Sequence, residues 1–269
     1  MDKAPDVIKI IYLIGELGRG GSERQLFLLL KQLVHKAFQL HVVVFNPSSY
    51  EVYNDELTRM GVELHLVPGD CRGVVKRARW LYRLFCKISP QIVHSWTTHD
   101  NPYAGLLGWL ARIPVRWGSV RGSLTSSGFQ RLPLVFRWLS LHGTSKLVVN
   151  SRAIIDELVL AGIAPVNIIF LQNCVEMEST GKVSDLGQYG VRQTQKVVGT
   201  VGNLRRVKNQ KMFVDAMAGI LLNSEDVAGV IVGQPVPEDP DLPDILASQI
   251  ENLGLKGRLV VTGFYEDVP

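Results

Sequence analysis

The sequence of 269 residues contains few cysteines and no long apolar run. Its three cysteines, Cys71, Cys86 and Cys174, are widely separated, which excludes a disulfide framework and a paired-cysteine zinc site. No apolar stretch approaches the roughly 18 residues that a membrane span needs, and the first residues lack the apolar segment of a signal peptide. We therefore expect a protein of a reducing compartment, with the cytoplasm as its location.

Motifs of several common enzyme classes are also missing. The sequence contains neither the H-E-x-x-H motif of zinc hydrolases nor the G-x-S-x-G motif of serine hydrolases. Gly181 and Lys182 are followed by Val183, so there is no phosphate loop of the G-x-x-x-x-G-K-[ST] kind. The first glycine cluster departs from G-x-G-x-x-G, and the second predicted strand ends Phe45-Asn46-Pro47 without a ribose-binding carboxylate. Nicotinamide and ATP chemistry are therefore disfavoured.

The net charge of +4 conceals an uneven distribution. Residues 1–175 contain 20 Lys and Arg against 12 Asp and Glu, whereas residues 176–269 contain 9 against 13. All five tryptophans lie in the first part. These differences predict two domains with different partners. No recognised nucleic-acid-binding module accompanies the basic part, so we expect no nucleic acid partner.

Short runs rich in valine and isoleucine alternate with helix-length amphipathic stretches. Strands that are apolar throughout are buried on both faces, so the pattern predicts a mostly parallel, helix-covered sheet: a doubly wound, Rossmann-like α/β domain over residues 1–175. The predicted strands are Ile8–Ile14, Leu40–Phe45, Val62–Val67, Gln91–Ser95, Val115–Val120, Lys146–Asn150 and Ile168–Leu171. The predicted helices are 22–36, 51–60, 72–88, 101–112, 131–142 and 151–161.

A second, shorter alternation follows a segment rich in Gly, Ser and Gln, Glu176–Gln195, which we interpret as a linker. Three strands in at most 94 residues are fewer than a doubly wound domain of ~100–150 residues contains. We expect a second Rossmann-like domain, residues 176–269, that is incomplete and leaves apolar surface uncovered near Leu259–Thr262. Its predicted strands are Lys196–Val201, Val227–Val232 and Arg258–Thr262, and its predicted helices are Asn209–Leu222 and Leu242–Leu253.

Two loops after strands are candidates for ligand binding, because ligands of open parallel sheets sit at the carboxyl ends of strands. The first contains Gly20 and Gly21 ahead of a helix, where free backbone N–H groups suit a diphosphate. The second places Arg205, Arg206 and Lys208 at a helix start, where cations are unfavourable unless an anion binds. The alternatives are a tight glycine turn and a solvated basic turn.

Four segments, taken in order, carry a family resemblance. They are Val7–Leu30 with its G-G-x-E-R element, Leu147–Glu176 with Asn173, Val198–Phe213, and Leu259–Pro269. Together they resemble group 1 glycosyltransferases of family 4, which have the two-domain GT-B fold. The resemblance implies an acceptor-side first domain and a donor-binding second domain. It also implies sugar transfer from a nucleotide sugar to an acceptor hydroxyl, with retention of configuration and without a metal or other cofactor.

The same resemblance assigns the site residues. The expected donor-binding positions are Gly20, Gly21, Gly202, Arg205, Lys208 and Gly263. Arg205 and Lys208 are also expected to be catalytic, because they would stabilise charge on the leaving diphosphate. The E-x(7)-E element that holds the donor sugar and ribose would lie beyond Pro269. We therefore expect a C-terminally truncated member that is weak or inactive by itself.

The sequence leaves more than one possibility for the partners and for the reaction. The acceptor is expected to be a sugar or a lipid-linked sugar, in cell-envelope polysaccharide or glycolipid synthesis. Two other functions fit the same two-domain plan: a non-hydrolysing nucleotide-sugar epimerase, which needs no acceptor, and a non-catalytic nucleotide-sugar-binding remnant. Where several family members place a catalytic histidine, this chain reads Ser119-Val120-Arg121-Gly122, and Arg121 is a candidate for binding an anionic acceptor.

Three further features have a functional and a structural interpretation. His94, at the end of the fourth predicted strand, is a candidate catalytic or acceptor-binding group, or else a buried structural histidine. Asp239 and Asp241 imitate a D-x-D metal motif but lie among prolines, so we interpret them as a solvated loop and expect no metal site. A basic stripe at helical spacing predicts peripheral binding to an anionic membrane surface, or else a solvated face. Its members are Arg72, Lys76, Arg79, Arg83 and Lys87.

Overall fold

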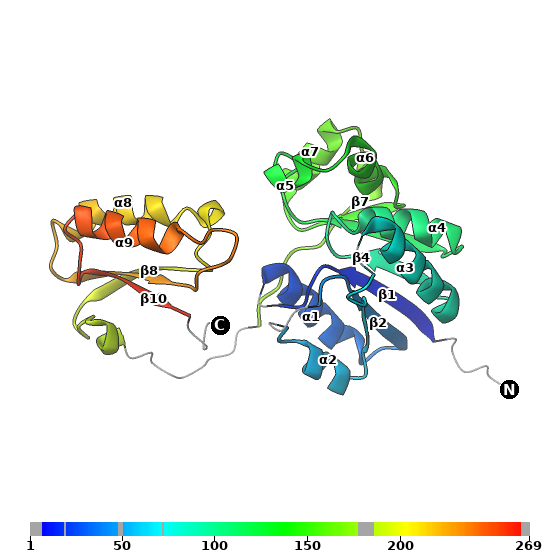
Figure 1. Ribbon diagram of the computed structural model, residues 1–269, viewed down its shortest axis with the longest axis horizontal. Helices are drawn as coiled ribbons and strands as arrows, with labels where there is room; N and C mark the ends of the chain where they lie inside the picture. Colours follow the sequence, from blue (N-terminus) through cyan, green and yellow to red (C-terminus); the bar gives the residue numbers. More distant parts are fainter. Residues whose placement is uncertain (1–6, 19, 48–50, 72, 177–185, 265–269) are drawn as a thin grey trace. The chain divides into compact units, whose positions relative to one another are not determined.

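In the computed structural model the chain forms two compact units, Met1–Val175 and Glu176–Pro269. The residues described are 7–18, 20–47, 51–71, 73–176 and 186–264 (Figure 1). Both units are parallel sheets covered by helices, which confirms the predicted α/β class. Among the helices of these described ranges, none is long and apolar enough to cross a membrane.

The first unit contains a seven-stranded parallel sheet with the order β3-β2-β1-β4-β5-β6-β7. The order reverses between β1 and β4, so the crevice expected for a ligand lies at the carboxyl ends of these neighbouring strands. Every strand overlaps a predicted apolar run. The strands are β1 Ile8–Ile14, β2 Phe38–Val44, β3 Glu63–Leu66, β4 Ile92–Ser95, β5 Val115–Val120, β6 Lys146–Val149 and β7 Ile168–Phe170.

Two predicted helices of this unit differ from those observed. The helix predicted over 131–142 is interrupted at Pro133, which starts a new helix instead of continuing the previous one. The helix predicted over 101–112 begins as a π-helix, where Gly105 packs directly against the backbone of Gly143. The elements are α1 Gly21–Leu33, α2 Asn54–Arg59, α3 Val74–Ile88, η1 Tyr103–Leu107, α4 Gly108–Leu110, α5 Ser127–Gln130, α6 Leu134–His142, α7 Arg152–Leu160 and η2 Pro165–Asn167.

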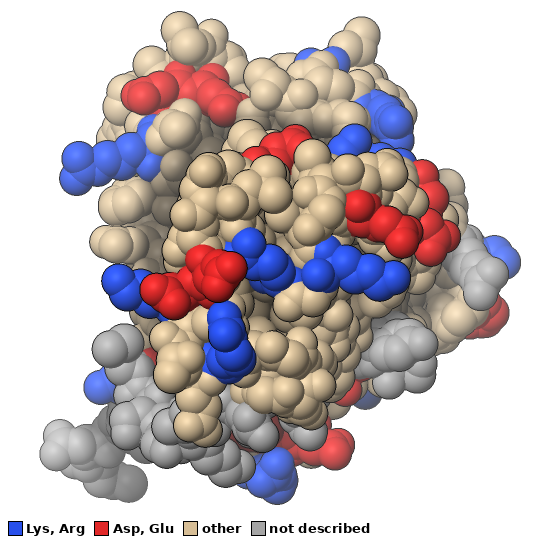
Figure 2. Space-filling model, turned by 90° about the vertical axis from the view of Figure 1, so that its left-hand side faces the viewer, with Lys and Arg blue, Asp and Glu red and all other residues tan. Residues whose placement is uncertain are grey.

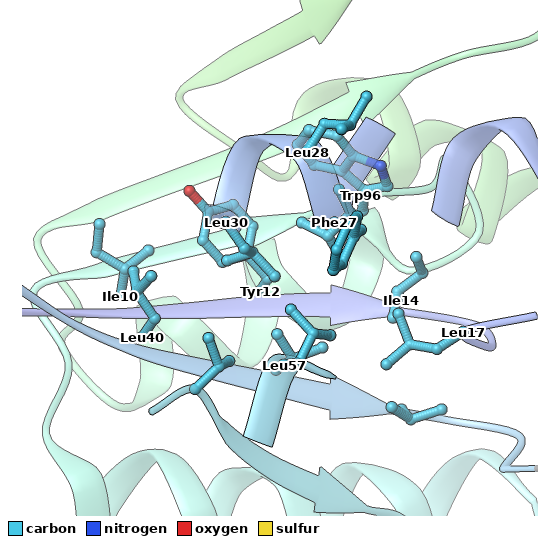
Figure 3. Close-up of a cluster of buried hydrophobic side chains, with 14 residues drawn as sticks. Ile10, Tyr12, Ile14, Leu17, Phe27, Leu28, Leu30, Leu40, Leu57 and Trp96 are labelled. Carbon is cyan, nitrogen blue, oxygen red and sulfur yellow. The ribbon is translucent and has the colours of Figure 1, made fainter. Parts of the chain in front are cut away.

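Hydrophobic clusters lie on the two faces of the first sheet. One joins the even-numbered residues of β1 and β2 to α1 and α2, and it includes Tyr12, Phe27 and Trp96 (Figure 3). The other joins the odd-numbered residues of the same strands to α3 through Leu81 and Phe85. Alternate side chains of a strand point to opposite faces, so these strands are apolar at nearly every position because both faces are covered.

The second unit contains a three-stranded parallel sheet with the order β10-β9-β8. Helices α8 and α9 both lie on one side of this sheet (Figure 1). The strands are β8 Lys196–Val201, β9 Val227–Val232 and β10 Leu259–Gly263, and the helices are α8 Gln210–Leu221 and α9 Leu242–Asn252, with the short turns η3 Leu186–Tyr189 and η4 Arg206–Lys208.

One expectation for the second unit needs correction, and a second holds only in part. Residues 186–195 are not linker, because Leu186 and Val191 pack against the sheet; residues 177–185 and 265–269 lie outside the described ranges. Uncovered apolar surface near Leu259–Thr262 is found at Val261, which is 39% exposed, and at the adjacent Phe264, which is 50% exposed, whereas Leu259 is buried beneath the helices. More of it lies on β8, where Val197, Val198 and Val201 are 44%, 41% and 60% exposed. Strands β8 and β10 are the two edges of this sheet, and β9 between them is largely buried.

Candidate functional site

The carboxyl edge of the first sheet brings Trp96 and Arg121 together. Trp96 follows β4, is buried, and donates from Nε1 to the carbonyl oxygen of Ser22 in α1 at 2.7 Å. Arg121 follows the neighbouring strand β5, and its Cζ lies 3.7 Å from the centroid of the Trp96 ring. Burial lowers the pKa of Arg121 to about 10, so the guanidinium remains charged at neutral pH. The stack holds a cation in place at this edge.

Two asparagines from the next strand ends extend the same edge. Nη1 of Arg121 and Nδ2 of Asn150 both approach Oδ1 of Asn173, at 3.5 Å and 3.4 Å. The loop that carries Asn173 is tied to α1, because Gln25 donates to the Cys174 carbonyl at 2.7 Å and accepts from its N–H at 2.8 Å. Within the described ranges, Nε of Arg121 and Oδ1 of Asn150 are buried without a hydrogen-bond partner. The edge therefore offers polar atoms to a ligand.

The glycine loop before α1 differs from the arrangement expected of it. The N–H of Gly20 donates to the Gly18 carbonyl at 2.9 Å, so this amide is already used. The carboxylate of Glu23 lies against Gly20, where any Cβ would collide with it, and burial raises the pKa of this carboxyl. A side-chain anion thus occupies the helix start that was assigned to a diphosphate. Of the two predicted donors, Gly21 is the more open, with no atom near its absent side chain.

His94 lies in the interior of the first unit. Its Nε2 and Oγ of Ser119 are 3.0 Å apart, and its ring packs against those of Tyr12, Trp96 and Trp117. Burial and the charge of Arg121 lower the pKa of this imidazole to about 3, so the ring is neutral at physiological pH. The geometry favours the structural interpretation of His94, as a residue that positions the end of β4.

Asp100 is a buried carboxyl in the loop after β4. Thr97 Oγ1 donates to its Oδ2 at 2.6 Å, which favours the charged form. Burial outweighs this hydrogen bond and the nearby charge of Arg77, and it raises the pKa of Asp100 to about 6. His99, one residue earlier, is exposed. Sequence reasoning missed Asp100, because nothing in the local pattern distinguishes a buried carboxyl from a solvated one.

The strands of the second unit end in glycines: Gly202 after β8, Gly233 after β9 and Gly263 in β10. Gly202 and Gly263 have φ angles of 151° and 75°, which side-chain-bearing residues rarely adopt. A Cβ on Gly233 would collide with the Gly202 carbonyl, so these two loops approach as closely as backbones allow. The carboxyl edge of this sheet is therefore free of side chains at three neighbouring positions, which permits a ligand to contact the backbone.

The three cations of the β8–α8 loop are not equivalent. Arg206 forms a two-pronged ion pair with Asp241, at 3.1 Å and 2.7 Å, and a second contact with Asp239 at 3.2 Å. The N–H of Arg206 also donates to Asp239, at 3.1 Å. Arg205 and Lys208 are exposed, and neither side chain has a hydrogen bond or ion pair to any described residue. The structure thus leaves two of the three cations available to an anion, and these are the two assigned from the sequence.

The two aspartates of the D-x-D sequence are therefore paired with Arg206. Arg206 lies 33 and 35 residues before Asp239 and Asp241, and the isolated bridge between Leu204 and Pro235 holds the two loops together. No local pattern in the sequence reveals such a pairing. On the face drawn in Figure 2, basic and acidic side chains are interspersed over a largely neutral surface.

Two parallel-sheet units with polar loops at their carboxyl edges are the architecture of the GT-B fold. The profile described as Glycosyltransferase Family 4 matches residues 19–179, and the one described as Glycosyl transferases group 1 matches residues 184–269. The first match covers more than half of the sequence, and the chain belongs to glycosyltransferase family 4. A comparison with curated proteins gave no match.

Solved structures share the fold at low sequence identity. The structure of Anabaena Alr3699/HepE in complex with UDP and glucose has a TM-score of 0.76 and 19% identity, covering 97% of this chain and 70% of that chain. A glycosyltransferase from Rickettsia africae has a TM-score of 0.70 and 14% identity, with coverages of 97% and 69%. A putative UDP-N-acetylglucosamine 2-epimerase from Listeria monocytogenes has a TM-score of 0.63 and 14% identity, with coverages of 96% and 69%.

Proposed function

We propose that this protein transfers a sugar from a nucleotide-activated donor to an acceptor hydroxyl, with retention of configuration, in the synthesis of a cell-envelope polysaccharide or a glycolipid. The observation that carries the proposal is that neighbouring cations in the β8–α8 loop differ in whether they form an ion pair. Arg206 is neutralised by two aspartates, whereas Arg205 and Lys208 remain exposed without an ion pair among the described residues. Unpaired cations at a helix start are favourable when an anion binds there.

The donor diphosphate is the anion that fits this loop. Arg205 supplies a planar fork for two phosphate oxygens and Lys208 a compact charge. The open backbone at Gly202 and Gly263 allows the nucleotide to approach the sheet edge. As the bond to the sugar breaks, negative charge develops on the leaving diphosphate, and the two cations stabilise it. This electrostatic role requires neither a covalent enzyme intermediate nor a metal ion.

Acceptor binding is assigned to the first unit. Arg121, fixed over Trp96, is a cation at the carboxyl edge, and the amides of Asn150 and Asn173 lie beside it. This set suits the hydroxyls of a sugar or the phosphate of a lipid-linked acceptor. The expected place of reaction is the cytoplasmic side of a membrane, where a lipid-linked acceptor is available.

The test is a donor assay with and without an acceptor. UDP-glucose is the first probe, since the HepE structures contain UDP and UDP-glucose. Acceptor-dependent release of UDP, with an unchanged rate in EDTA, is the expected result. A changed sugar formed without any acceptor would instead support an epimerase. Binding of UDP by calorimetry with no turnover on any donor would support a nucleotide-sugar-binding protein, and the transferase proposal would then be rejected.

A further inference from the structure

A cluster of two histidines and a glutamate lies in the first sheet, on the strands β2 and β3. His41 of β2 is directly opposite Glu63 of β3 in the strand register, and His65 is two residues further along β3. His41 lies two residues before Val43 in β2, so both side chains point to the same face of the sheet. Val43 packs in the hydrophobic cluster that includes α3, so the three side chains are on the face that α3 covers. The cluster is away from the loops that follow these strands, so it is separate from the residues assigned to donor and acceptor.

Two of the distances between the potential ligand atoms are close to those that a small tetrahedral ion imposes. Nδ1 of His41 lies 3.1 Å from Nε2 of His65 and 3.4 Å from Oε2 of Glu63. Two ligand atoms bound at about 2.0–2.1 Å with tetrahedral angles are roughly 3.3–3.4 Å apart. One potential ligand atom from each of the three side chains lies within 4.8 Å of the other two. An ion placed among them therefore requires only small side-chain adjustments.

We propose that His41, Glu63 and His65 bind a divalent transition-metal ion, of which Zn²⁺ fits best, with water as the fourth ligand. Two imidazole nitrogens and one carboxylate oxygen form a donor set that suits Zn²⁺, Co²⁺ or Ni²⁺, whereas Mg²⁺ and Ca²⁺ prefer oxygen ligands alone. The earlier expectation of no metal site rests on sequence spacing, and these ligands are too far apart in the sequence to form a recognisable motif.

The surroundings of the three side chains fit this assignment. Gln39 Nε2 donates to Oε1 of Glu63 at 2.8 Å, which orients the carboxylate and leaves Oε2 for the ion. Burial is the largest cause that lowers the pKa of both imidazoles, a direction that favours the neutral form of a metal-binding ring. The ammonium of Lys9, which raises the local positive potential, donates to the Ile88 carbonyl at 3.2 Å. Glu63 has a 53% exposed side chain, so an ion can enter from solvent.

The role of the ion is structural. Strand β3 is at the edge of the sheet and has only four residues, so its pairing with β2 is a weak point of the first unit. An ion shared by the two strands would fix this pairing. Nε2 of His41 is buried without a partner among the described residues, so the site lacks the outer acceptor that commonly orients a ligating imidazole. We expect affinity about 10–100-fold weaker than that of a site with such an acceptor.

The first test is a Co²⁺ titration of the metal-stripped, untagged 269-residue chain. The expected result is one equivalent bound, with the visible absorption of four-coordinate Co²⁺ and no thiolate charge-transfer band, which separates this site from the free cysteines. His65→Ala and Glu63→Gln should each weaken binding at least about tenfold. The matched control is His35→Ala, since His35 is exposed and outside the cluster. Equal affinity in the wild type and in Glu63→Gln would overturn the proposal.

The second test measures stability instead of binding. Saturating Zn²⁺ should raise the melting temperature of the first unit by about 5 °C in the wild type and in His35→Ala, and Mg²⁺ should not. In Glu63→Gln, which retains the volume of the side chain, the shift at the same Zn²⁺ concentration should be clearly smaller, while the metal-free melting temperature stays close to the wild-type value. No shift in the wild type would show that His41 and His65 are joined by a hydrogen bond alone, and the proposal would fail.

Discussion

The guanidinium of Arg121 lies over the indole of Trp96, with 3.7 Å between Cζ and the ring centroid. Trp96 also donates a hydrogen bond to Ser22, so one pair of side chains links the ends of β4 and β5 to the start of α1. A charged group that is fixed in this way loses little freedom when a ligand binds, which favours recognition of an anion. The stack should also contribute to the stability of the first unit.

Arg121→Lys keeps the charge but removes the planar surface that stacks on Trp96. We expect it to lower the free energy of unfolding of the first unit by about 1–2 kcal/mol. Urea unfolding followed by tryptophan fluorescence measures this unit alone, because all five tryptophans are in it. Arg131→Lys, at an exposed position, is the control. If both variants unfold at the wild-type midpoint, the stack makes no net contribution.

We expect donor binding to depend on two cations of the second unit. Because Arg205 and Lys208 have no ion pair among the described residues, replacing either with alanine removes a contact to the diphosphate and no internal one. Each variant should bind UDP at least about tenfold more weakly, as expected for a charge-assisted hydrogen bond. Calorimetric titration measures the affinity. Lys211→Ala, on the same segment, should bind like the wild type. Wild-type affinity in both Arg205→Ala and Lys208→Ala would exclude this loop as the diphosphate site.

Two buried groups make the stability of the first unit respond to acid in opposite directions. The pKa of His94 is lowered from 6.5 to about 3, so between these values only the unfolded chain binds the proton, and stability falls as the pH falls. The pKa of Asp100 is raised from 3.8 to about 6, so between these values only the folded chain binds the proton, and stability rises as the pH falls. Between about pH 4 and pH 6 the two effects oppose each other.

Asp100→Asn isolates one of these effects. The variant should be more stable than the wild type at pH 7, because it avoids burying a charge and can still accept from Thr97. The difference should shrink by about 1.4 kcal/mol per pH unit as the pH falls from 6 to 4. Urea unfolding by tryptophan fluorescence at several pH values measures it. Asp156→Asn, an exposed carboxyl, should show no such trend. A difference that is independent of pH would mean that Asp100 titrates normally.

Membrane association should depend on α3. Lys76, Arg79, Arg83 and Lys87 are all exposed on this helix, whereas Leu81, Phe85 and Ile88 face the core; Arg72, the fifth member of the predicted stripe, lies outside the described residues. We expect salt-sensitive co-sedimentation with anionic vesicles, with up to about 1 kcal/mol for each basic residue near the surface. The double variant Arg79→Glu, Arg83→Glu should remain in the supernatant. Equal recovery with neutral and anionic vesicles would show that the stripe is only solvated.

The two units should differ in resistance to protease. The first sheet has helices over both faces, whereas in the second unit the edge strand β8 exposes valines. Limited proteolysis should therefore leave a fragment that ends near Glu176. Mass spectrometry of the fragments identifies it. A second unit as resistant as the first would contradict this expectation.

The sequence by itself determined the secondary structure and the fold class. Strands β1, β5 and β9 have the predicted bounds, because apolar runs flanked by turn residues define buried parallel strands without reference to the rest of the chain. The same local information placed three cations, Arg205, Arg206 and Lys208, at a helix start. It also located the division between the two units after residue 175, where the alternation of apolar runs and amphipathic stretches stops.

Only the tertiary structure decided how these residues are used. Sheet order places Arg121 on Trp96, and strand register places His41 beside Glu63 and His65; neither is encoded by spacing along the chain. The contact between the β8 and β9 loops neutralises Arg206 with Asp239 and Asp241 and leaves its neighbours unpaired. Burial makes His94 a neutral interior group, and this burial depends on side chains from several strands. Charge, pKa and pairing are set by surroundings that long-range packing assembles, and a local pattern does not contain them.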